Sequence, residues 1–411
     1  MSNYDKEVSI VIPTYNRIEL LEFTLLSLYE QSIPARNFEV IVVNDGSTDK
    51  TRKVLSKLKT PFRLKVLHNK SNKGAAYSRN RGIKASRGEI IIFLDEMLVD
   101  SDFIKGHLAY HSKEKMVVTT TFNGKFIYTH KYPGFTRKQK RKCKEIAKKT
   151  GAGKFKTLKK GVRRLFPPDE VINHSVLQYG LTARHIYNQY YTLQDTYGLY
   201  LERMAAPWFL FVTNGISLSR KMLNQAAGMF DEKFEGAWLE DWELGYRFYQ
   251  AGASFYNATD IACYHQSHPI GTNNKSRVVN YLYFTEKFPE IEVLLVAAMT
   301  RPFRWSFVSW GNIVTQLKEL EKYPETGVQY AEFITAFRDL AQDLRWYTAV
   351  KVNNQELHLL TSYEAGFARW KPAFAGRVKK QLEQLEQKSL LSGRYFYLVK
   401  GFKDLLRLPM N

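Results

Sequence analysis

Polar side chains gather at four places in the sequence where they could act on a ligand. Three are short clusters that each follow an apolar run: Thr14–Asn16, Asn44–Ser47 and Asp95–Glu96. The fourth is the acidic pair Glu240–Asp241, which two tryptophans flank. Carboxylates accept hydrogen bonds, take protons as general bases and bind hard divalent cations. The pattern therefore indicates a polar ligand site with acid–base chemistry.

The elements that must position these clusters are the strands of an α/β sheet. Apolar runs at 8–13, 38–43, 62–67 and 88–94 predict four strands, and their lack of clean alternation is typical of parallel strands covered on both faces. Ligands bind open sheets of this kind beyond the carboxyl ends of the strands. Since the three clusters lie there, we expect them to meet at one edge.

A helix is predicted after the first of these strands. Asn16 and Glu19 resemble a capping box, and Leu21, Leu25 and Leu28 then mark one helical face. Farther along, the segments 208–219 and 253–265 predict strands, and 238–252 predicts a short helix.

The chain is long enough for two domains. We expect an α/β domain at 1–275 with a basic and aromatic insert at 112–205, followed by a helical domain at 276–411. The helical domain is a candidate surface for homo-oligomer formation.

Several classes of protein are excluded or disfavoured by the sequence. Neither a GxGxxG nor a GxxxxGK[ST] motif occurs, so a dinucleotide fingerprint and a P-loop are absent. Two cysteines cannot form a disulfide framework, which fits a reducing compartment. The beginning shows no basic region followed by an apolar run, and no run approaches 18 apolar residues. We therefore expect a cytoplasmic protein, soluble or peripheral to a membrane.

The charge of the chain is unusual and local. Its 61 Lys and Arg against 40 Asp and Glu give +21, and the segment 131–164 alone holds 15 basic residues against one acid, Glu145. This concentration indicates a local anion-binding device rather than a nucleic-acid-coating surface, so no nucleic acid partner is expected.

The second half of the basic segment has a helical apolar stripe. Its members are Phe155, Leu158, Val162, Leu165 and Phe166. A basic amphipathic helix within 131–166 could lie on an anionic membrane or hold a polyanionic acceptor. Alternatively, the stripe packs on the core and the charged face is solvated. Both interpretations stay open at this point.

Four segments together resemble the family 2 glycosyltransferases, which have the GT-A fold and use nucleotide sugars. They are VSIVIPTYNR (8–17), VIVVNDGSTD (40–49), NKGAAYSRNRGIKASRGEIIIFLDEM (72–97) and LEDWELGYR (239–247). They occur in the family's order and cover about residues 7–270. The resemblance implies an α/β fold of the GT-A type, with a mostly parallel Rossmann-like sheet, and a C-terminal helical part outside the family's region.

The resemblance implies the residues that hold the donor. Asp45 would accept a hydrogen bond from the imide N–H of a uracil base, and Pro13 and Tyr15 would line the base pocket. Arg79 would lie near the base or the phosphates, and Asp95 would contact the ribose and the metal region.

A divalent cation, Mn²⁺ or Mg²⁺, is also implied, because it would neutralise the leaving diphosphate. The family has a second acid two residues after Asp95, where this chain has Met97, a poor ligand for a hard cation. The predicted ligands are therefore Asp95, Glu96 and His265. We expect His268 to be structural.

The resemblance assigns the general base to Asp241, which would take the acceptor's proton, and Glu243 could orient it. The acceptor-side candidates are Asn214, Trp238, Glu240 and Trp242.

The predicted function is inverting transfer of a sugar, hexosyl or N-acetylhexosaminyl, from a UDP-sugar-like donor. The acceptor would be a glycan, a cell-wall polymer, a lipid or a peptide. Two alternatives remain: a non-catalytic relative that binds sugar nucleotides or glycans, and an interaction protein whose basic segment binds a polyanion.

Overall fold

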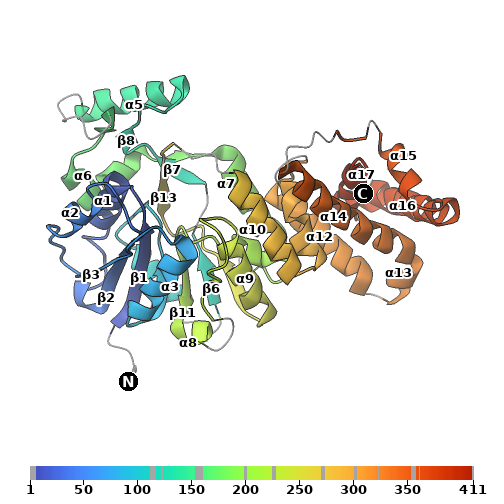
Figure 1. Ribbon diagram of the computed structural model, residues 1–411, viewed down its shortest axis with the longest axis horizontal. Helices are drawn as coiled ribbons and strands as arrows, with labels where there is room; N and C mark the ends of the chain where they lie inside the picture. Colours follow the sequence, from blue (N-terminus) through green and yellow to red (C-terminus); the bar gives the residue numbers. More distant parts are fainter. Residues whose placement is uncertain are drawn as a thin grey trace. The chain divides into compact units, whose positions relative to one another are not determined.

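The computed structural model divides the chain into two compact units (Figure 1). It describes residues 6–111, 117–121, 124–152, 161–198, 201–224, 228–269, 274–299, 303–322, 324–352, 358–360 and 362–409. The first unit contains residues up to 195 with 199–201 and 208–272, and the second contains 196–198, 202–207 and the chain from 273 onward. The predicted boundary near 275 falls beside residues outside the described part, and the division into two domains stays a proposal.

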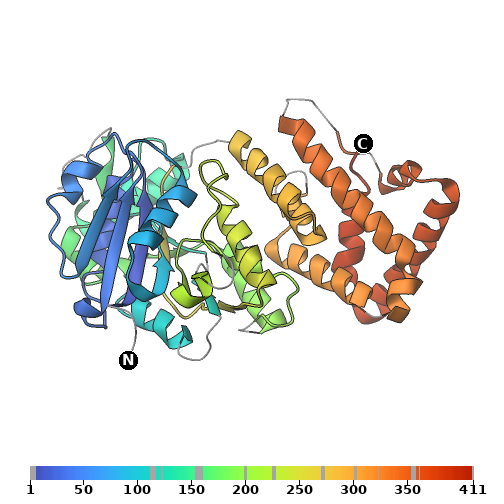
Figure 2. The same cartoon turned by 60° about the horizontal axis from the view of Figure 1, so that its bottom comes forward.

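The first unit is built on a seven-stranded sheet in the order β12-β6-β11-β4-β1-β2-β3. Its strands are β1 (Lys6–Thr14), β2 (Phe38–Asn44), β3 (Arg63–His68), β4 (Gly88–Phe93), β6 (Val117–Thr120), β11 (Ile216–Ser219) and β12 (Ser254–Asn257). The strands β1 to β4 pair in parallel, and β11 runs antiparallel to both of its neighbours. The four strands predicted first are confirmed, as is the α/β class with a mostly parallel central sheet; β1 and β2 lie side by side in both views (Figures 1 and 2).

Helices cover both faces of this sheet. They are α1 (Ile18–Ser27), α2 (Thr51–Leu55), α3 (Ala75–Ala85) and α4 (Phe103–His111). Leu21 and Leu25 of α1 and the N-terminal residues of α4 share one core with alternate residues of the strands, among them Ile10 and Val40. On the other face α3 packs directly on β1, because a Cβ at Gly82 would lie 2.3 Å from Val11 Cγ1. This burial of both faces explains the unbroken apolar runs in the sequence.

A second, four-stranded sheet in the order β10-β7-β13-β5 combines two strands of the insert, β10 and β7, with two strands from outside it, β13 and β5. The insert also forms a two-stranded ribbon of β8 with β9. These strands are β5 (Met97–Val99), β7 (Lys125–Ile127), β8 (His130–Lys131), β9 (Arg163–Arg164), β10 (Leu181–Thr182) and β13 (Cys263–Gln266). The helices around them are α5 (Arg137–Thr150), α6 (Pro168–Ile172) and α7 (Arg184–Tyr197), followed by α8 (Arg220–Met222) and α9 (Glu240–Gln250).

The predicted capping box at Asn16 is not formed. The helix begins at Ile18 with Arg17 as its N-cap and no side-chain cap. Asn16 instead has a φ of 56°, and its Oδ1 accepts hydrogen bonds from the backbone N–H groups of Thr48 and Asp49 at 2.9 and 3.2 Å. Asn16 therefore joins the loop after β1 to the loop after β2.

Two predicted strands are shorter than the sequence indicated. Only Ile216–Ser219 of the segment 208–219 is a strand, and Pro207–Leu210 is a 3-10 helix with Trp208 fully buried. The segment 253–265 is divided between β12 and β13, which belong to different sheets. A continuous apolar run shows that a segment is buried, but it does not distinguish a strand from a short helix.

The helical stripe predicted across 155–166 is only partly testable, because residues 153–160 lie outside the described residues. Within the described part the helix is wrong: Arg163 and Arg164 form a strand that pairs with Lys131 and His130. Val162, Leu165 and Phe166 are nevertheless buried, as the core-packing alternative expected.

The second unit is helical, as predicted. Its α-helices are α10 (Asn274–Lys287), α11 (Ile291–Leu294), α12 (Phe307–Lys322), α13 (Pro324–Gln329), α14 (Ala331–Val352), α15 (Tyr363–Gly366), α16 (Pro372–Ser392) and α17 (Phe396–Leu405). Phe333 and Phe337 of α14 pack on Phe402 of α17, with ring centroids 4.5 and 5.9 Å apart. No helix in the described part of the chain is long and apolar enough to cross a bilayer.

The position of α9 depends on a glycine. A Cβ at Gly245 would lie 2.4 Å from Phe211 Cβ and 2.8 Å from the Trp208 carbonyl oxygen. We predict that Gly245→Ala lowers the free energy of unfolding by about 1–3 kcal/mol, measured by denaturant titration, because the helix must move to relieve the overlap.

Gly376 is the matched control, since it is an exposed helical glycine whose Cβ would meet nothing within 4 Å. Gly376→Ala should be neutral or stabilise the protein by up to about 1 kcal/mol. Equal stability of the parent and Gly245→Ala would contradict the close packing of α9.

Candidate active site

The loops after β1 and β2 meet at the carboxyl edge of the central sheet. Thr14 and Asn44 are register partners at the ends of their strands, and the Asn16 N–H donates to Ser47 Oγ at 2.9 Å. Pro13 and Tyr15 therefore lie beside the loop that carries Asp45. The Tyr15 side chain is 43% exposed, so its ring is available to a ligand.

Asp45 is buried at this edge, and both of its oxygens already accept hydrogen bonds from the chain. Oδ1 accepts from Asn69 Nδ2 at 2.6 Å and from the Lys73 N–H at 2.8 Å, and Oδ2 accepts from the Gly74 N–H at 2.9 Å. Gly46 follows with a φ of 70°, and a Cβ there would lie 2.4 Å from the backbone of Ser71. Asp45 thus fastens the loop after β2 to the loop that leads into α3.

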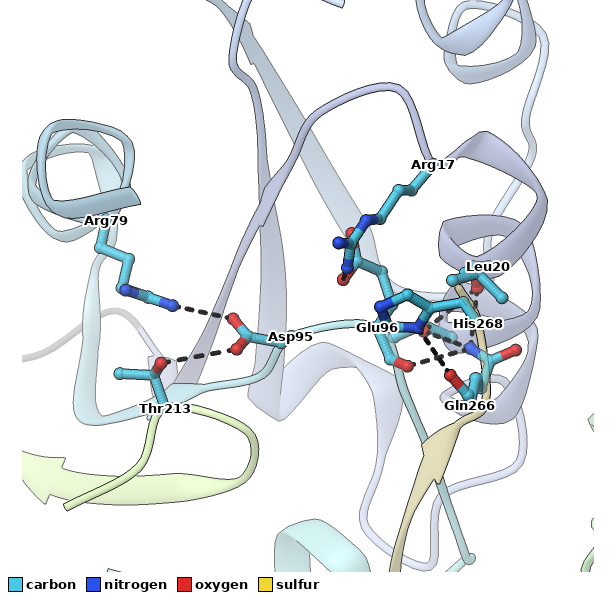
Figure 3. A network of polar contacts seen from close by, with 9 residues as sticks. Arg17, Leu20, Arg79, Asp95, Glu96, Thr213, Gln266 and His268 are labelled. Carbon is cyan, nitrogen blue, oxygen red and sulfur yellow. Dashed lines mark hydrogen bonds and ion pairs between the residues drawn. The ribbon is translucent and has the colours of Figure 1, made fainter. Parts of the chain in front are cut away.

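Arg79 of α3 joins two acidic segments that are far apart in the sequence. Its Nη1 donates to Glu240 Oε1 at 2.8 Å, and its Nη2 lies 3.1 Å from Asp95 Oδ1. The guanidinium also lies 5.4 Å from the Phe230 ring centroid. Figure 3 shows Asp95 between Arg79 and Thr213, whose Oγ1 lies 3.5 Å from Asp95 Oδ2.

The protonation of this arginine follows from its surroundings. Burial by itself would lower the pKa of Arg79, but the carboxylates of Asp95, Glu240 and Asp241 outweigh it and raise the pKa. The guanidinium therefore stays charged and balances part of the acidic cluster around it.

The start of α9 has an unusual backbone. Trp238 and Leu239 both have positive φ, 109° and 72°, in residues with bulky side chains. Such conformations cost about 1–3 kcal/mol each and persist only where surrounding contacts fix them. Here Glu240 Oε2 accepts from the Trp238 N–H while its other oxygen binds Arg79. The strained turn places Glu240 and Asp241 in the first turn of the helix.

Asp241 differs from Glu240 in its surroundings. Its Oδ1 accepts from the Trp242 N–H at 2.9 Å, and no side-chain ion pair to it occurs among the described residues. Burial, followed by repulsion from Glu240, raises the pKa of Asp241 well above its ordinary value of 3.8. A carboxylate with a raised pKa is suited to take a proton from a hydroxyl near neutral pH.

Aromatic rings surround this acidic turn. The ring centroids of Trp238 and Trp242 are 6.3 Å apart, and those of Trp208 and Trp242 are 6.4 Å apart. They provide an apolar wall beside Asp241. Glu243 points elsewhere, since both of its oxygens bind Arg247 at 2.8 and 2.9 Å, so it does not orient Asp241.

The three predicted metal ligands do not converge. Asp95 faces Arg79, whereas Glu96 Oε2 lies 3.3 Å from Arg17 Nη1, and Figure 3 shows the two acids turned away from each other. Met97 is fully buried in the core. Among the described residues no group of three or more His, Cys, Asp and Glu side chains surrounds a common point.

His265 lies opposite Met97 in the pairing of β13 with β5, and its ring centroid is 5.1 Å from that of His268. Burial lowers the pKa of His265 to about 4, so the ring is neutral at pH 7. His268 Nδ1 lies 2.9 Å from the Gln266 carbonyl oxygen, which fits its expected structural role. Asp95, Glu96 and His265 therefore do not form a three-ligand site for a divalent cation. We assign no step of the reaction to a cation.

Comparison with known proteins identifies the family. The profile described as Glycosyl transferase family 2 matches residues 9–166. The glycosyltransferase YfnE of Bacillus subtilis (strain 168) is 34% identical over 302 residues, which are 72% of this chain and 74% of that protein. The chain belongs to glycosyltransferase family 2. Its α/β sheet agrees with the GT-A fold of this family.

Two further similar proteins share less of their sequence with this chain. Validoxylamine A glucosyltransferase of Streptomyces hygroscopicus subsp. jinggangensis (strain 5008) is 28% identical over 325 residues, 77% of this chain and 68% of that protein. The solved structure of S. aureus TarS 1-349 in complex with UDP-GlcNAc is 15% identical, covers 95% of this chain and 93% of that chain, and has a TM-score of 0.46.

The structure of this family 2 glycosyltransferase brings most of the predicted site residues to one region. Arg79, Asp95, Glu240 and Asp241 form one polar network, and Trp238 and Trp242 flank it. Asn214 follows Thr213 on the adjoining loop, and its Oδ1 is buried without a hydrogen-bond partner among the described residues. The roles of these residues in catalysis stay predictions.

Sequence reasoning missed three residues that the structure places in or beside the network. Arg17, Thr213 and Leu239 contribute an ion pair, a hydroxyl and a strained backbone. The first two stand inside the segments that predicted the site, TYNR and TNGIS, so their polar side chains were a signal. Nothing in the sequence signals the positive φ of Leu239.

The hydrogen bonds of Asp45 give a prediction. Asn at this position offers an N–H₂ group where Asp45 accepts a backbone hydrogen bond, and the loss of a charge-assisted hydrogen bond costs roughly 1.5–3 kcal/mol. We expect Asp45→Asn to lower the melting temperature of the ligand-free protein in a thermal scan.

Asp102→Asn is the control, because Asp102 is an exposed carboxylate in the same unit. It should leave the melting temperature unchanged. If Asp45→Asn melts like the parent without ligand, the role of Asp45 in fastening the two loops is contradicted.

Proposed function

We propose that this glycosyltransferase transfers a hexosyl or N-acetylhexosaminyl group from a UDP-sugar to an acceptor hydroxyl, with inversion at the anomeric carbon. The observation that carries the proposal is Asp241: a half-buried carboxylate of raised pKa, beside a positive guanidinium and a wall of tryptophans. Transfer from nucleotide sugars is the activity of the family, and a glucosyltransferase is among the relatives of this chain.

The donor would lie along the carboxyl edge of the sheet. Exposed Tyr15 and neighbouring Pro13 would contact the base. The loop that Asp45 fastens would supply the rim of the base site, and Asp45 would face the imide N–H of uracil. Asp95, which Arg79 holds from one side, would accept from the ribose hydroxyls.

The acceptor would occupy the opposite side of the network. Its sugar or polyol ring would pack on Trp238 and Trp242, with Asn214 and Glu240 as hydrogen-bond partners. A hydroxyl oxygen of the acceptor would attack the anomeric carbon while Asp241 takes its proton. The bond from that carbon to the diphosphate oxygen breaks, and UDP leaves.

The first prediction from this proposal concerns the chemical step. Asp241→Asn keeps the size of the side chain but removes the base, so turnover should fall by about 10²–10⁴-fold while UDP affinity stays within a few-fold. Transfer rates in a donor screen and UDP calorimetry would measure the two effects.

Asp169→Asn, at an exposed position of α6, serves as the matched control and should retain the parent rate. If Asp241→Asn turns over at nearly the parent rate, the general base must be another residue. A complete lack of transfer and donor hydrolysis by the parent, with donors bound, would favour the non-catalytic alternative.

The second prediction concerns the cation. Enzymes with this fold commonly use a divalent metal, but here Asp95 is paired with Arg79, Glu96 is paired with Arg17, and Met97 is buried. We therefore expect UDP to bind in EDTA with an affinity within about tenfold of that in Mn²⁺, a difference of about 1.4 kcal/mol.

Calorimetry in the two buffers, corrected for binding of Mn²⁺ to UDP alone, would measure the difference. If UDP affinity is lost in EDTA and restored by Mn²⁺, the prediction is contradicted. Asp95 would then have to leave Arg79 and bind the cation together with other predicted metal ligands.

A further inference from the structure

A cavity of about 590 Å³ lies beside α5, in the basic insert that the sugar-transfer network does not use. Its cationic lining consists of Lys131, Lys144, Lys148, Arg163 and Arg164, and its apolar lining includes Cys143, Ala147 and Leu165. No carboxylate lines it. Figure 1 shows α5 well apart from α3 and α9, which carry the network, so the cavity is a separate site.

Three of these cations are available to a ligand. No ion pair joins Lys131, Lys144 or Lys148 to a carboxylate within the described residues. Arg164, in contrast, lies 2.9 Å from Glu22 Oε2 and over the Phe23 ring, which fixes the strand that forms one wall. The unbalanced charge of the cavity therefore comes from the lysines, which two different elements supply.

The local fold holds the backbone of α5, which carries Lys144 and Lys148, in place without a ligand. A capping box at Thr136 and Gln139 begins α5, and Gly151 with a φ of 66° ends it. Cys143 and Ile146 anchor the buried face of the helix in the core. Since these contacts fix the backbone that carries Lys144 and Lys148, only their exposed side chains must become ordered when a ligand binds.

The chemistry of the lining selects the ligand. Several ammonium groups around one concave space favour a polyvalent anion, because a single carboxylate cannot engage all of them. Phosphate groups carry more charge and more acceptor oxygens than carboxylates. The cavity has the size of sites for small organic ligands, about 300–1,000 Å³, and its apolar wall can contact the carbon skeleton between phosphates.

A membrane surface fits the insert less well. Amphipathic helices bind bilayers by inserting an exposed apolar face. Here Ile146 of α5 and Val162, Leu165 and Phe166 around β9 are each at most 5% exposed. The exposed face of α5 offers charge alone.

We propose that this cavity is a second anion-binding site, distinct from the sugar-transfer site, which binds a soluble molecule carrying two or more phosphate groups. The proposal rests on the described cavity and does not depend on the identity of the donor or of the base.

Two charge-matched variants of the same helix test it. Lys144→Gln/Lys148→Gln removes two charges from the lining, whereas Lys138→Gln/Lys149→Gln removes two exposed charges of α5 that do not line the cavity. The probe is tripolyphosphate, titrated by calorimetry at physiological ionic strength, where exposed charges are screened beyond about 8 Å.

We expect the lining variant to lose affinity about tenfold or more, as the loss of charge-assisted hydrogen bonds requires, and the control variant to change less than about threefold. Donor hydrolysis and melting temperature should be the same in both variants and the parent. This separates failure of the proposal from failure of the transferase itself, because hydrolysis is read without the probe.

Equal loss of affinity in the two variants, or no binding of tripolyphosphate by the parent, would overturn the proposal in favour of diffuse attraction along α5. A second arm uses vesicles of phosphatidylglycerol and phosphatidylcholine. Vesicle binding that the lining variant alone loses, without binding of tripolyphosphate, would overturn the soluble ligand and assign the site to a lipid headgroup.

Discussion

The ion pairs of the buried Arg79 hold the candidate active site together. Taking a guanidinium out of water is expensive unless carboxylates lie close to it, and removing one partner of a buried pair leaves an uncompensated charge. Arg79 is on α3, Asp95 follows β4, and Glu240 begins α9. The charge of each segment is therefore compensated only when the other two are in place. The segment after β4, the start of α9 and the helix α3 thus depend on one another for their positions.

This constraint also separates the roles of two adjacent acids. Glu240 has the guanidinium as a direct partner and the Trp238 N–H as a second one, so its charge is compensated. Among the described residues Asp241 has only a backbone partner, and it is half-buried beside the Glu240 carboxylate. Glu240 is bound to the guanidinium, and Asp241 is left with a raised pKa. A pair of titratable groups with diverging environments is typical of an acid–base site.

The sequence predicted the parts of this account that depend on periodicity and on strand ends. The runs at 8–13 and 38–43 are buried strands because both faces of the sheet are covered, and the clusters after them meet because parallel strands end at one edge. The sequence could not predict which carboxylate would pair with which arginine. Asp95 and Glu96 are neighbours in the chain, yet they turn to Arg79 and Arg17, since the turn after β4 directs their side chains apart.

Other differences have the same origin. Asn16 has the right residue type and spacing to cap a helix. Its side chain instead accepts hydrogen bonds from two backbone N–H groups of another loop. Arg163 and Arg164 stand in a segment with helical periodicity, but strand pairing with His130 and Lys131 overrides it. Long-range contacts of this kind leave no local signal in the sequence.

The pH dependence of kcat/KM in the parent and in Glu240→Gln tests the central claim most directly. A base must be deprotonated to act, so the rate should fall as the pH falls through the pKa of Asp241, at a pH well above its ordinary 3.8. Removing the negative charge of Glu240 relieves the repulsion and leaves more of the Arg79 charge to Asp241, so the acid limb should move to lower pH. An acid limb near 3.8 in the parent, or one that stays in place in a folded Glu240→Gln, would contradict the account.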